Sequence, residues 1–301
     1  MTNLVLVILC LIIGILLQHV KDMPENAPKA LNTYLIYIVL PALALMHIPN
    51  MDLNPHLLLP VISAWISFGL SWLIFGWLGR NFSWEKSTTG CLVIVSGLAN
   101  TSFIGFPVIE ALFGGEGLKI ALLIDQAGSF IIVSSIAIIV ASLFGHERKR
   151  KRDVTKKILT FPPFLFFILA LVMNFFQMEF QGMPHEILES FAVTLTPVAL
   201  ISVGLQVKIN ASTLSYRYLW YGLGYKLILI PGFIFLVFRF LFDPNDLLYK
   251  VSVMEAAMAP MITGSVIAIN HDLNPKLASL LVGIGIPLSF ITLLAWYALL
   301  A

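Results

Sequence analysis

The fold is decided by a polar interruption in the middle of an apolar stretch, Ser96-Gly97-Leu98-Ala99-Asn100-Thr101-Ser102-Phe103-Ile104-Gly105-Phe106-Pro107. Pro107 lacks the backbone N–H that a helix needs and clashes with the preceding turn, and Gly105 lets the backbone unwind. Backbone groups that are freed in hydrocarbon must line a cavity or be capped by side chains. Asn100, Thr101 and Ser102 can act as such caps, and they can equally bind a substrate or an ion. The alternative is a proline kink with no binding role.

A second interruption of the same kind lies near the C-terminus, in Glu255-Ala256-Ala257-Met258-Ala259-Pro260-Met261-Ile262-Thr263-Gly264-Ser265. Pro260 and Gly264 predict the break, and Thr263 adds a hydroxyl group. An offset of 156 residues places Asn100–Pro107 on this segment. The same offset aligns Leu40-Pro41-Ala42-Leu43 with Thr196-Pro197-Val198-Ala199. Paired interruptions in two halves are typical of transporters built from inverted repeats.

The composition places the chain in a lipid bilayer. Hydrophobic residues make up 59% of the 301 residues, charged residues 11%, and the mean hydropathy is +0.93. A soluble chain is about 45–50% apolar and about 25% charged. With about 20 residues for each spanning helix, the apolar runs predict an all-α protein of ten transmembrane helices. They lie at about 3–20, 29–48, 56–79, 87–112, 118–144, 158–177, 185–206, 214–242, 247–269 and 275–300.

One connection, residues 146–157, is strongly basic and predicts the orientation. Fourteen of the 18 Lys and Arg residues fall on its side of the predicted membrane. Since cytoplasmic loops carry the excess of Lys and Arg, we expect this loop in the cytoplasm and both termini outside, in the inner cell membrane. Contact with membrane lipids is the expected role of the loop, and a specific lipid or protein site is the alternative. The loop separates two five-helix halves, 1–145 and 158–301, which an odd helix number forces into opposite orientations.

An anionic substrate is expected from this orientation. The half-helix that follows each interruption begins near the middle of the membrane, so its positive N-terminal end faces inward. Two such ends that face one cavity favour an anion. Lys226, in the eighth predicted helix, adds a full positive charge if it reaches that cavity. The net charge of +2 gives no reason to expect nucleic acid as a partner.

Carboxylates within the predicted helices are few, which makes each one a candidate functional residue. Glu255 directly precedes the second interruption, and we predict that it gains and loses a proton in the cavity that holds the substrate. The alternative is a permanent ion pair with Lys226. Asp125, with Gln126 beside it, is either an ion-coupling site or a structural partner for a freed backbone group.

Signatures of enzymes are missing from the sequence. It contains no Gly-rich phosphate loop, nucleophile elbow or His-Glu-x-x-His motif. Cys10 and Cys91 fall within apolar runs without the spacing of metal ligands, and we expect them to be buried. We therefore predict a protein that is not an enzyme and uses no cofactor or metal.

The residues around the first interruption resemble the auxin efflux carrier family, which includes the plant PIN-type exporters and many bacterial permeases. That family shows Asn-Thr followed by Gly-x-Pro, as Asn100-Thr101 and Gly105-Phe106-Pro107 do here. Further similarity extends over the whole chain. It includes Leu31-Asn32 with Pro41, Ser202-Val203-Gly204-Leu205, Lys226 with Pro231, Ala256-Ala257-Met258-Ala259-Pro260, and Asn274-Pro275.

The resemblance implies a fold similar to that of bile-acid symporters, with two inverted five-helix repeats in which broken helices 4 and 9 cross. It also implies a scaffold of helices 1, 2, 6 and 7, a transport domain of helices 3–5 and 8–10 that moves as an elevator, and a homodimer through helices 2 and 7. The short basic loop resembles bacterial members, for which malate or malonate are the usual substrates. Glu255 stands where plant members carry an uncharged amide, which does not favour auxin itself.

The sequence thus predicts a secondary transporter of a small carboxylate, coupled to H⁺. The site is predicted at Asn100, Thr101, Ser102, Gly105, Pro107, Lys226, Pro260 and Thr263, with Glu255, Asp125 and Gln126 as coupling residues. One rival is a Na⁺-coupled carrier of a bulkier amphipathic anion. Another is a membrane sensor that binds its ligand without moving it.

Overall fold

The structure, a computed structural model, describes residues 2–145, 161–207 and 216–300. The predicted basic loop therefore lies outside the described residues. Within them the chain is all-helical, and the extended backbone forms a single isolated bridge. This confirms the all-α class.

In the first half, the helices follow one another with short connections. They are α1 (Thr2–Leu17), α2 (Ala27–Tyr34), η1 (Leu35–Val39), α3 (Leu40–His47), η2 (Pro55–Leu57), α4 (Leu58–Asn81), α5 (Lys86–Gly97), η3 (Thr101–Gly105), α6 (Phe106–Leu123), η4 (Ile124–Phe130), α7 (Ile131–Ser134) and α8 (Ile136–Phe144). Gly114 has φ +67° inside α6 and divides this continuous run between the predicted helices 87–112 and 118–144.

The second half repeats this style of construction. Its elements are α10 (Pro162–Phe175), α11 (Met183–Ala192), α12 (Leu195–Gly204), α13 (Arg217–Gly224), η6 (Tyr225–Leu229), α14 (Ile230–Phe238), α15 (Leu247–Ala256), α16 (Ile262–Asn270) and α17 (Pro275–Leu300). The elements η1, η3, η4 and η6 are π-helical turns within longer helices.

Three of these π-helical turns have the same cause. Pro41, Pro107 and Pro231 each stand within the first two residues of the helix that follows η1, η3 and η6. A proline donates no backbone hydrogen bond, and a widened turn before it lets the helix continue. Each of these prolines is therefore carried inside a continuous helical run.

Six described helices are long and apolar enough to cross a membrane, and two further apolar helices are shorter. The six are Ala27–His47, Pro55–Asn81, Thr101–Phe144, Met183–Gly204, Arg217–Phe238 and Pro275–Leu300, and the two shorter ones are Val5–Leu17 and Pro162–Phe175. Many of their apolar side chains are exposed on the outer surface, as lipid requires. This supports a multi-pass membrane protein, and the count of ten spans stays a prediction.

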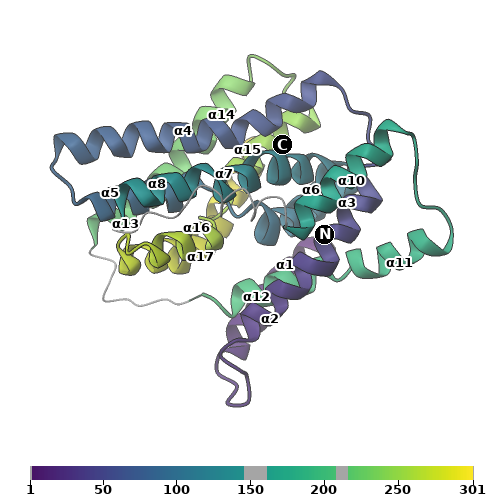
Figure 1. The fold of residues 1–301 in the computed structure, drawn as a ribbon, viewed down its shortest axis with the longest axis horizontal. Helices are drawn as coiled ribbons and strands as arrows, with labels where there is room; N and C mark the ends of the chain where they lie inside the picture. Colours follow the sequence, from purple (N-terminus) through teal and green to yellow (C-terminus); the bar gives the residue numbers. More distant parts are fainter. Residues whose placement is uncertain (1, 146–160, 208–215, 301) are drawn as a thin grey trace.

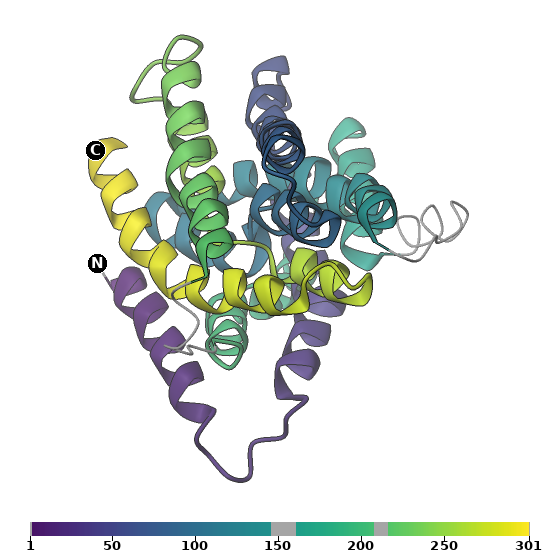
Figure 2. The ribbon, with the colours of Figure 1, turned by 90° about the vertical axis from the view of Figure 1, so that its left-hand side faces the viewer.

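The helices pack as two groups. In the first group α1 packs on α12, α12 on α2, and both α10 and α11 on α3. In the second, α4 and α16 pack on α5, α15 on α6 and α14, and α17 on α13 and α16. Figure 1 shows the first group on the right and most of the second on the left. The turn between α1 and α2 projects beyond the rest of the molecule (Figure 2).

The two glycines at the contact of α1 with α12 explain how closely these helices approach. A Cβ on Gly14 would lie 2.4 Å from the carbonyl oxygen of Ile201, and one on Gly204 would lie 2.5 Å from that of Leu11. Small residues allow such backbone contact between membrane helices. The side-chain amide of Gln18 then donates to the carbonyls of Gly204, at 2.7 Å, and Val207, at 2.8 Å.

Candidate functional site

The first interruption begins where α5 ends. Its C-cap Leu98 is extended, with ψ 135°, and helical structure resumes at Thr101. Asn100 caps the new helix, because its Oδ1 accepts from the backbone N–H of Phe103 at 3.3 Å. The prediction of an interruption is confirmed, but its expected position at Gly105 and Pro107 is wrong. Pro107 lies inside the run η3–α6, since the π-helical turn before it accommodates the missing donor.

The second interruption lies between α15, which ends at Ala256, and α16, which begins at Ile262. Pro260 lies in this non-helical segment, as predicted, whereas Gly264 is inside α16. The N-cap Met261 has extended backbone, with φ −70° and ψ 126°.

The two interruptions pair with each other. Ala99 and Pro260 form an antiparallel bridge. The N–H of Asn100 donates to the carbonyl of Ala259 at 2.8 Å, and the N–H of Met261 donates to the carbonyl of Leu98 at 3.1 Å. Backbone groups that no helix can satisfy are thus satisfied across the crossing, which makes unwound chain tolerable inside a membrane.

A cavity of about 460 Å³ adjoins one side of this crossing. Its polar wall contains Asn100, Ser102, Asp125, Gln126 and Thr263. The other walls are largely apolar and include Leu40, Phe103, Phe130, Val133, Ile138, Phe161, Val266 and Ile267. The cavity therefore has a polar end at the crossing and an apolar body. Pockets of this size and character accept small organic molecules.

Asp125 organises the polar wall. Its Oδ1 accepts from the hydroxyls of Thr101 and Ser102, and its Oδ2 accepts from Nε2 of Gln126 at 2.7 Å. These contacts hold η3 against η4. Asp125 thus partners side chains of the crossing, which differs from the freed backbone group expected as its structural partner.

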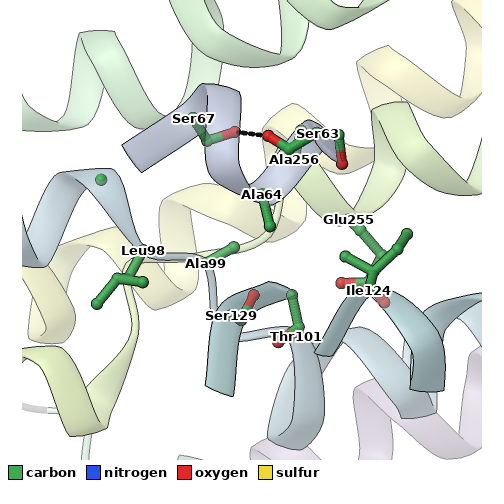
Figure 3. A pocket seen from close by; sticks show the side chains of 11 residues that line it. Ser63, Ala64, Ser67, Leu98, Ala99, Thr101, Ile124, Ser129, Glu255 and Ala256 are labelled. Carbon is green, nitrogen blue, oxygen red and sulfur yellow. Dashed lines mark hydrogen bonds between the residues drawn. The ribbon is translucent and has the colours of Figure 1, made fainter. Parts of the chain in front are cut away.

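A second, much smaller cavity of about 10 Å³ lies by Ala99 and Thr101. Figure 3 shows Ser63 and Ser67 from α4, Thr101, Ser129 from η4 and Glu255 from α15 around it. Its volume is that of about one water molecule. Both carboxyl oxygens of Glu255 are buried and have no hydrogen-bond partner among the described residues.

The placement of Glu255 corrects one expectation. Ala99 and Thr101 line the small cavity, whereas Asn100 and Ser102 line the large one. Glu255 lines the small cavity, so it does not face the same cavity as Asn100 and Ser102, as one common site would require.

Lys226 also lies elsewhere than expected. Its fully buried Nζ donates to the carbonyl of Ala256, at the end of α15, at 2.8 Å. It lines neither of these two cavities. Among the described residues it forms no ion pair with Glu255 within 4.0 Å, so the permanent pair considered as the alternative role of Glu255 is not formed here. Lys226 instead binds the C-terminal end of α15, the helix that precedes the second interruption.

The structure thus brings together five of the predicted site residues at the large cavity and two, Thr101 and Glu255, at the small one. Gly105 contacts the Glu255 carboxylate, and Pro260 forms the bridge. Ser63, Ser67 and Ser129 line the small cavity but were not among the predicted site residues. The spacing of Ser63 and Ser67 by four residues, which puts both hydroxyls on one helix face, was the available signal. Cys10 and Cys91 are free and buried, as predicted.

Comparison with known proteins agrees with this architecture. The family described as "Membrane transport protein" matches residues 1–297. A protein named as an uncharacterised transporter from Methanothermobacter thermautotrophicus is 28% identical, and the match covers 99% of this chain and 98% of that protein. Another from Methanocaldococcus jannaschii, also named as an uncharacterised transporter, is 26% identical over 98% of this chain and 97% of its own. The family consists of transporters and not of enzymes. With the match extending over almost its full length, the chain belongs to the membrane transport protein family, that of the auxin efflux carriers.

Proposed function

We propose that this chain is a secondary active transporter that carries a small organic anion by elevator-type alternating access. The observation that carries the proposal is the crossing itself, where two interrupted helices pair through the backbones of Leu98, Asn100, Ala259 and Met261 beside a cavity of about 460 Å³. Such paired interruptions place substrate sites of transporters at the interface of their repeats.

An anion is favoured by the ends of the two half-helices. η3 begins after Asn100 and α16 after Met261, so both N-terminal ends lie at the crossing. Each end carries the equivalent of roughly half a positive charge. Asn100 adds a neutral donor, because its Nδ2 has no partner among the described residues. The substrate class is therefore a small carboxylate such as malate, malonate or an auxin-like acid.

The architecture in this proposal is ten membrane-spanning helices in two inverted repeats, 1–145 and 158–301. The group α1–α3 with α10–α12 supplies the scaffold, and the remaining helices supply the transport domain. The contacts support this division, because most helices pack within their own group and α6 meets α1 and α12 across the boundary. In this arrangement the crossing belongs to the moving part.

Orientation and assembly belong to the same proposal. Both termini lie outside the inner cell membrane, the loop 146–157 lies in the cytoplasm against lipid headgroups, and a homodimer forms through the scaffold helices that contain α3 and α12. In intact cells, a membrane-impermeant thiol reagent should label a cysteine added at the C-terminus and spare Lys151→Cys. The reverse pattern contradicts the orientation.

Coupling to protons completes the proposal, with Asp125, Gln126 and Glu255 as the residues concerned. Asp125 lines the large cavity, so its charge opposes that of a bound anion and a proton on it favours loading. Glu255 lies on the other side of the crossing and acts across it. Transfer of the proton with the anion is then symport by linkage.

A second candidate has its own support in the two cavities. Oxygen ligands suit hard cations, and the small cavity offers the Glu255 carboxylate beside the hydroxyls of Ser63, Ser67, Thr101 and Ser129. The apolar walls of the large cavity fit a bulkier body. Together these features favour a Na⁺-coupled carrier of an amphipathic anion.

Solute counterflow in proteoliposomes tests the proposal. Vesicles loaded with unlabelled malate, malonate, indole-3-acetate or a bile acid should accumulate the same labelled acid transiently. Imposed pH and Na⁺ gradients then separate the two couplings. Binding of an acid without any exchange of label would identify a membrane sensor and contradict the proposed transport.

A further inference from the structure

The polar wall of the large cavity leaves two atoms of opposite hydrogen-bonding character without partners among the described residues. One is Nδ2 of Asn100, a donor, and the other is Oε1 of Gln126, an acceptor. Both side chains line the cavity, and they are only 3% and 2% exposed. Buried polar atoms in native proteins nearly always have partners, and leaving one unpaired is costly. The pair therefore points to a ligand that supplies what is missing.

The chemical character of each free atom is fixed by its neighbours. Nε2 of Gln126 donates to Oδ2 of Asp125 at 2.7 Å. Reversing this amide would set its oxygen against a carboxylate oxygen, so Oε1 is the end left free. Oδ1 of Asn100 accepts from the N–H of Phe103 in the same way, which leaves Nδ2 free. The two buried amides of the wall thus offer one donor and one acceptor, in a fixed order.

The hydroxyls of Thr101 and Ser102 do not change this balance. Thr101 and Ser102 both give their protons to Oδ1 of Asp125, so these donors are in use. A plain carboxylate presents only acceptors. It satisfies Asn100 but leaves Oε1 of Gln126 unpaired and facing other lone pairs. A substrate that also carries an O–H or N–H group beside its carboxylate satisfies both atoms.

We propose that Gln126 is a specificity-determining residue that accepts a hydrogen bond from a hydroxyl or amino group of the substrate, which makes the substrate a hydroxy- or amino-substituted carboxylate. This inference rests on the proposed function and narrows its substrate class. Asn100 receives the carboxylate, and Asp125 holds the Gln126 amide in the orientation that leaves Oε1 free to accept.

Two matched sets of acids test the inference in the purified wild-type protein. The compact set is succinate, malate and aspartate, and the amphipathic set is 3-phenylpropionate, 3-phenyllactate and phenylalanine. Within each set only the group at one carbon changes, from H to OH to NH₃⁺. A site with an unpaired acceptor rejects the analogue that lacks the donor. In at least one set we expect a donor-bearing member to bind about tenfold or more tightly than the unsubstituted acid. Comparison of the hydroxy acid with the amino acid in each set identifies which donor Gln126 accepts from.

Variants then assign the preference to Gln126. Gln126→Met keeps the length of the side chain but removes its acceptor. The affinity of the donor-bearing acid should then be about equal to that of the unsubstituted acid. The control Ser102→Ala removes another contact to Asp125 and leaves Oε1 of Gln126 in place, so the ratio between the paired acids should persist. Equal affinities within both sets in the wild type overturn this inference alone, as does a Gln126→Met protein that retains the wild-type ratio. Failure of every acid to bind overturns the proposed function and this inference with it.

Discussion

The carboxylate of Glu255 occupies the space that a side chain on Gly105 would need, because a Cβ at Gly105 would lie 2.6 Å from Oε2 and 2.7 Å from Oε1. Gly105 lies in η3, after the first interruption, and Glu255 lies in α15, before the second. The glycine is therefore required by the close approach of the two interrupted helices.

Gly105→Ala should destabilise the protein by about 1–3 kcal/mol, because the added methyl overpacks the crossing. Thermal unfolding in detergent measures the effect. In a Glu255→Ala background the same substitution should cost much less, since the atoms that it meets are gone. Gly69→Ala is the matched control, because a Cβ there has no neighbour within 4 Å. An equal cost of Gly105→Ala in both backgrounds would contradict the contact.

Asn100→Ala should weaken binding of the organic anion. The substitution removes a donor from a dehydrated site, which costs on the order of 1–3 kcal/mol, or roughly a five- to 150-fold loss of affinity. Asn100→Asp separates the two roles of this residue. It keeps the oxygen that caps η3 but replaces the free donor with a second oxygen, so it should fold normally and still bind poorly. Isothermal titration measures both affinities, and wild-type affinity in a folded Asn100→Ala protein rejects the assignment.

Anion binding should tighten as the pH falls, if buried carboxylates at the crossing couple to the substrate. Asp125 and Glu255 become neutral when protonated, which removes repulsion of the anion. Asp125→Asn and Glu255→Gln imitate the protonated forms. Each should bind the anion at neutral pH at least as tightly as the wild type, with a weaker dependence on pH.

Because Asp125 lines the large cavity, its variant should flatten the pH profile more than Glu255→Gln does. If the Glu255→Gln protein keeps the wild-type pH profile of anion binding, Glu255 takes no part in the coupling. If both variants keep that profile, proton coupling through the crossing is excluded.

Lys226→Met should lower stability more than it lowers affinity. It removes the bond from Nζ to the carbonyl of Ala256 and leaves a buried acceptor unpaired, at a cost of about 1–3 kcal/mol. Lys250→Met, on the partly exposed face of the same helix α15, should be nearly neutral. A large loss of affinity in a Lys226→Met protein with unchanged melting temperature would return Lys226 to the substrate site.

The interruptions could be predicted from the sequence because glycine, proline and small polar residues inside an apolar run conflict with a regular helix. Their exact limits could not. Pro107 pointed to a break at its own position, but a π-helical turn absorbs its missing donor and the break lies earlier, at Leu98–Asn100. Local residue types predict that a helix is disturbed, whereas the partner backbone, here Ala259 and Met261, decides where it opens.

Which residues line which cavity could not be predicted from the sequence for a related reason. The pairing of Ala99 with Pro260 places this segment between the two cavities, where Asn100 lines the large one and Thr101 the small one. The contact of Thr196 with Glu110 was likewise missed, because it joins helices far apart in the sequence.

That last contact offers the most direct test of the central claim, that one group of helices moves against the other to carry the substrate. The hydroxyl of Thr196, in α12, donates to Oε2 of Glu110, in α6, at 3.3 Å across the boundary between the groups. A disulfide or short bifunctional reagent joining Glu110→Cys to Thr196→Cys fixes that boundary. The control pair, Asn32→Cys with Ser202→Cys, joins two residues of the scaffold group whose side chains lie 2.7 Å apart.

The measurement is counterflow of the labelled organic acid by each cross-linked pair in proteoliposomes, before and after the link is broken. We predict that the Glu110–Thr196 link stops exchange and that its cleavage restores it, while the Asn32–Ser202 link leaves exchange near the unlinked rate. Exchange that continues at the unlinked rate through a fully cross-linked Glu110–Thr196 pair would contradict movement of the two groups.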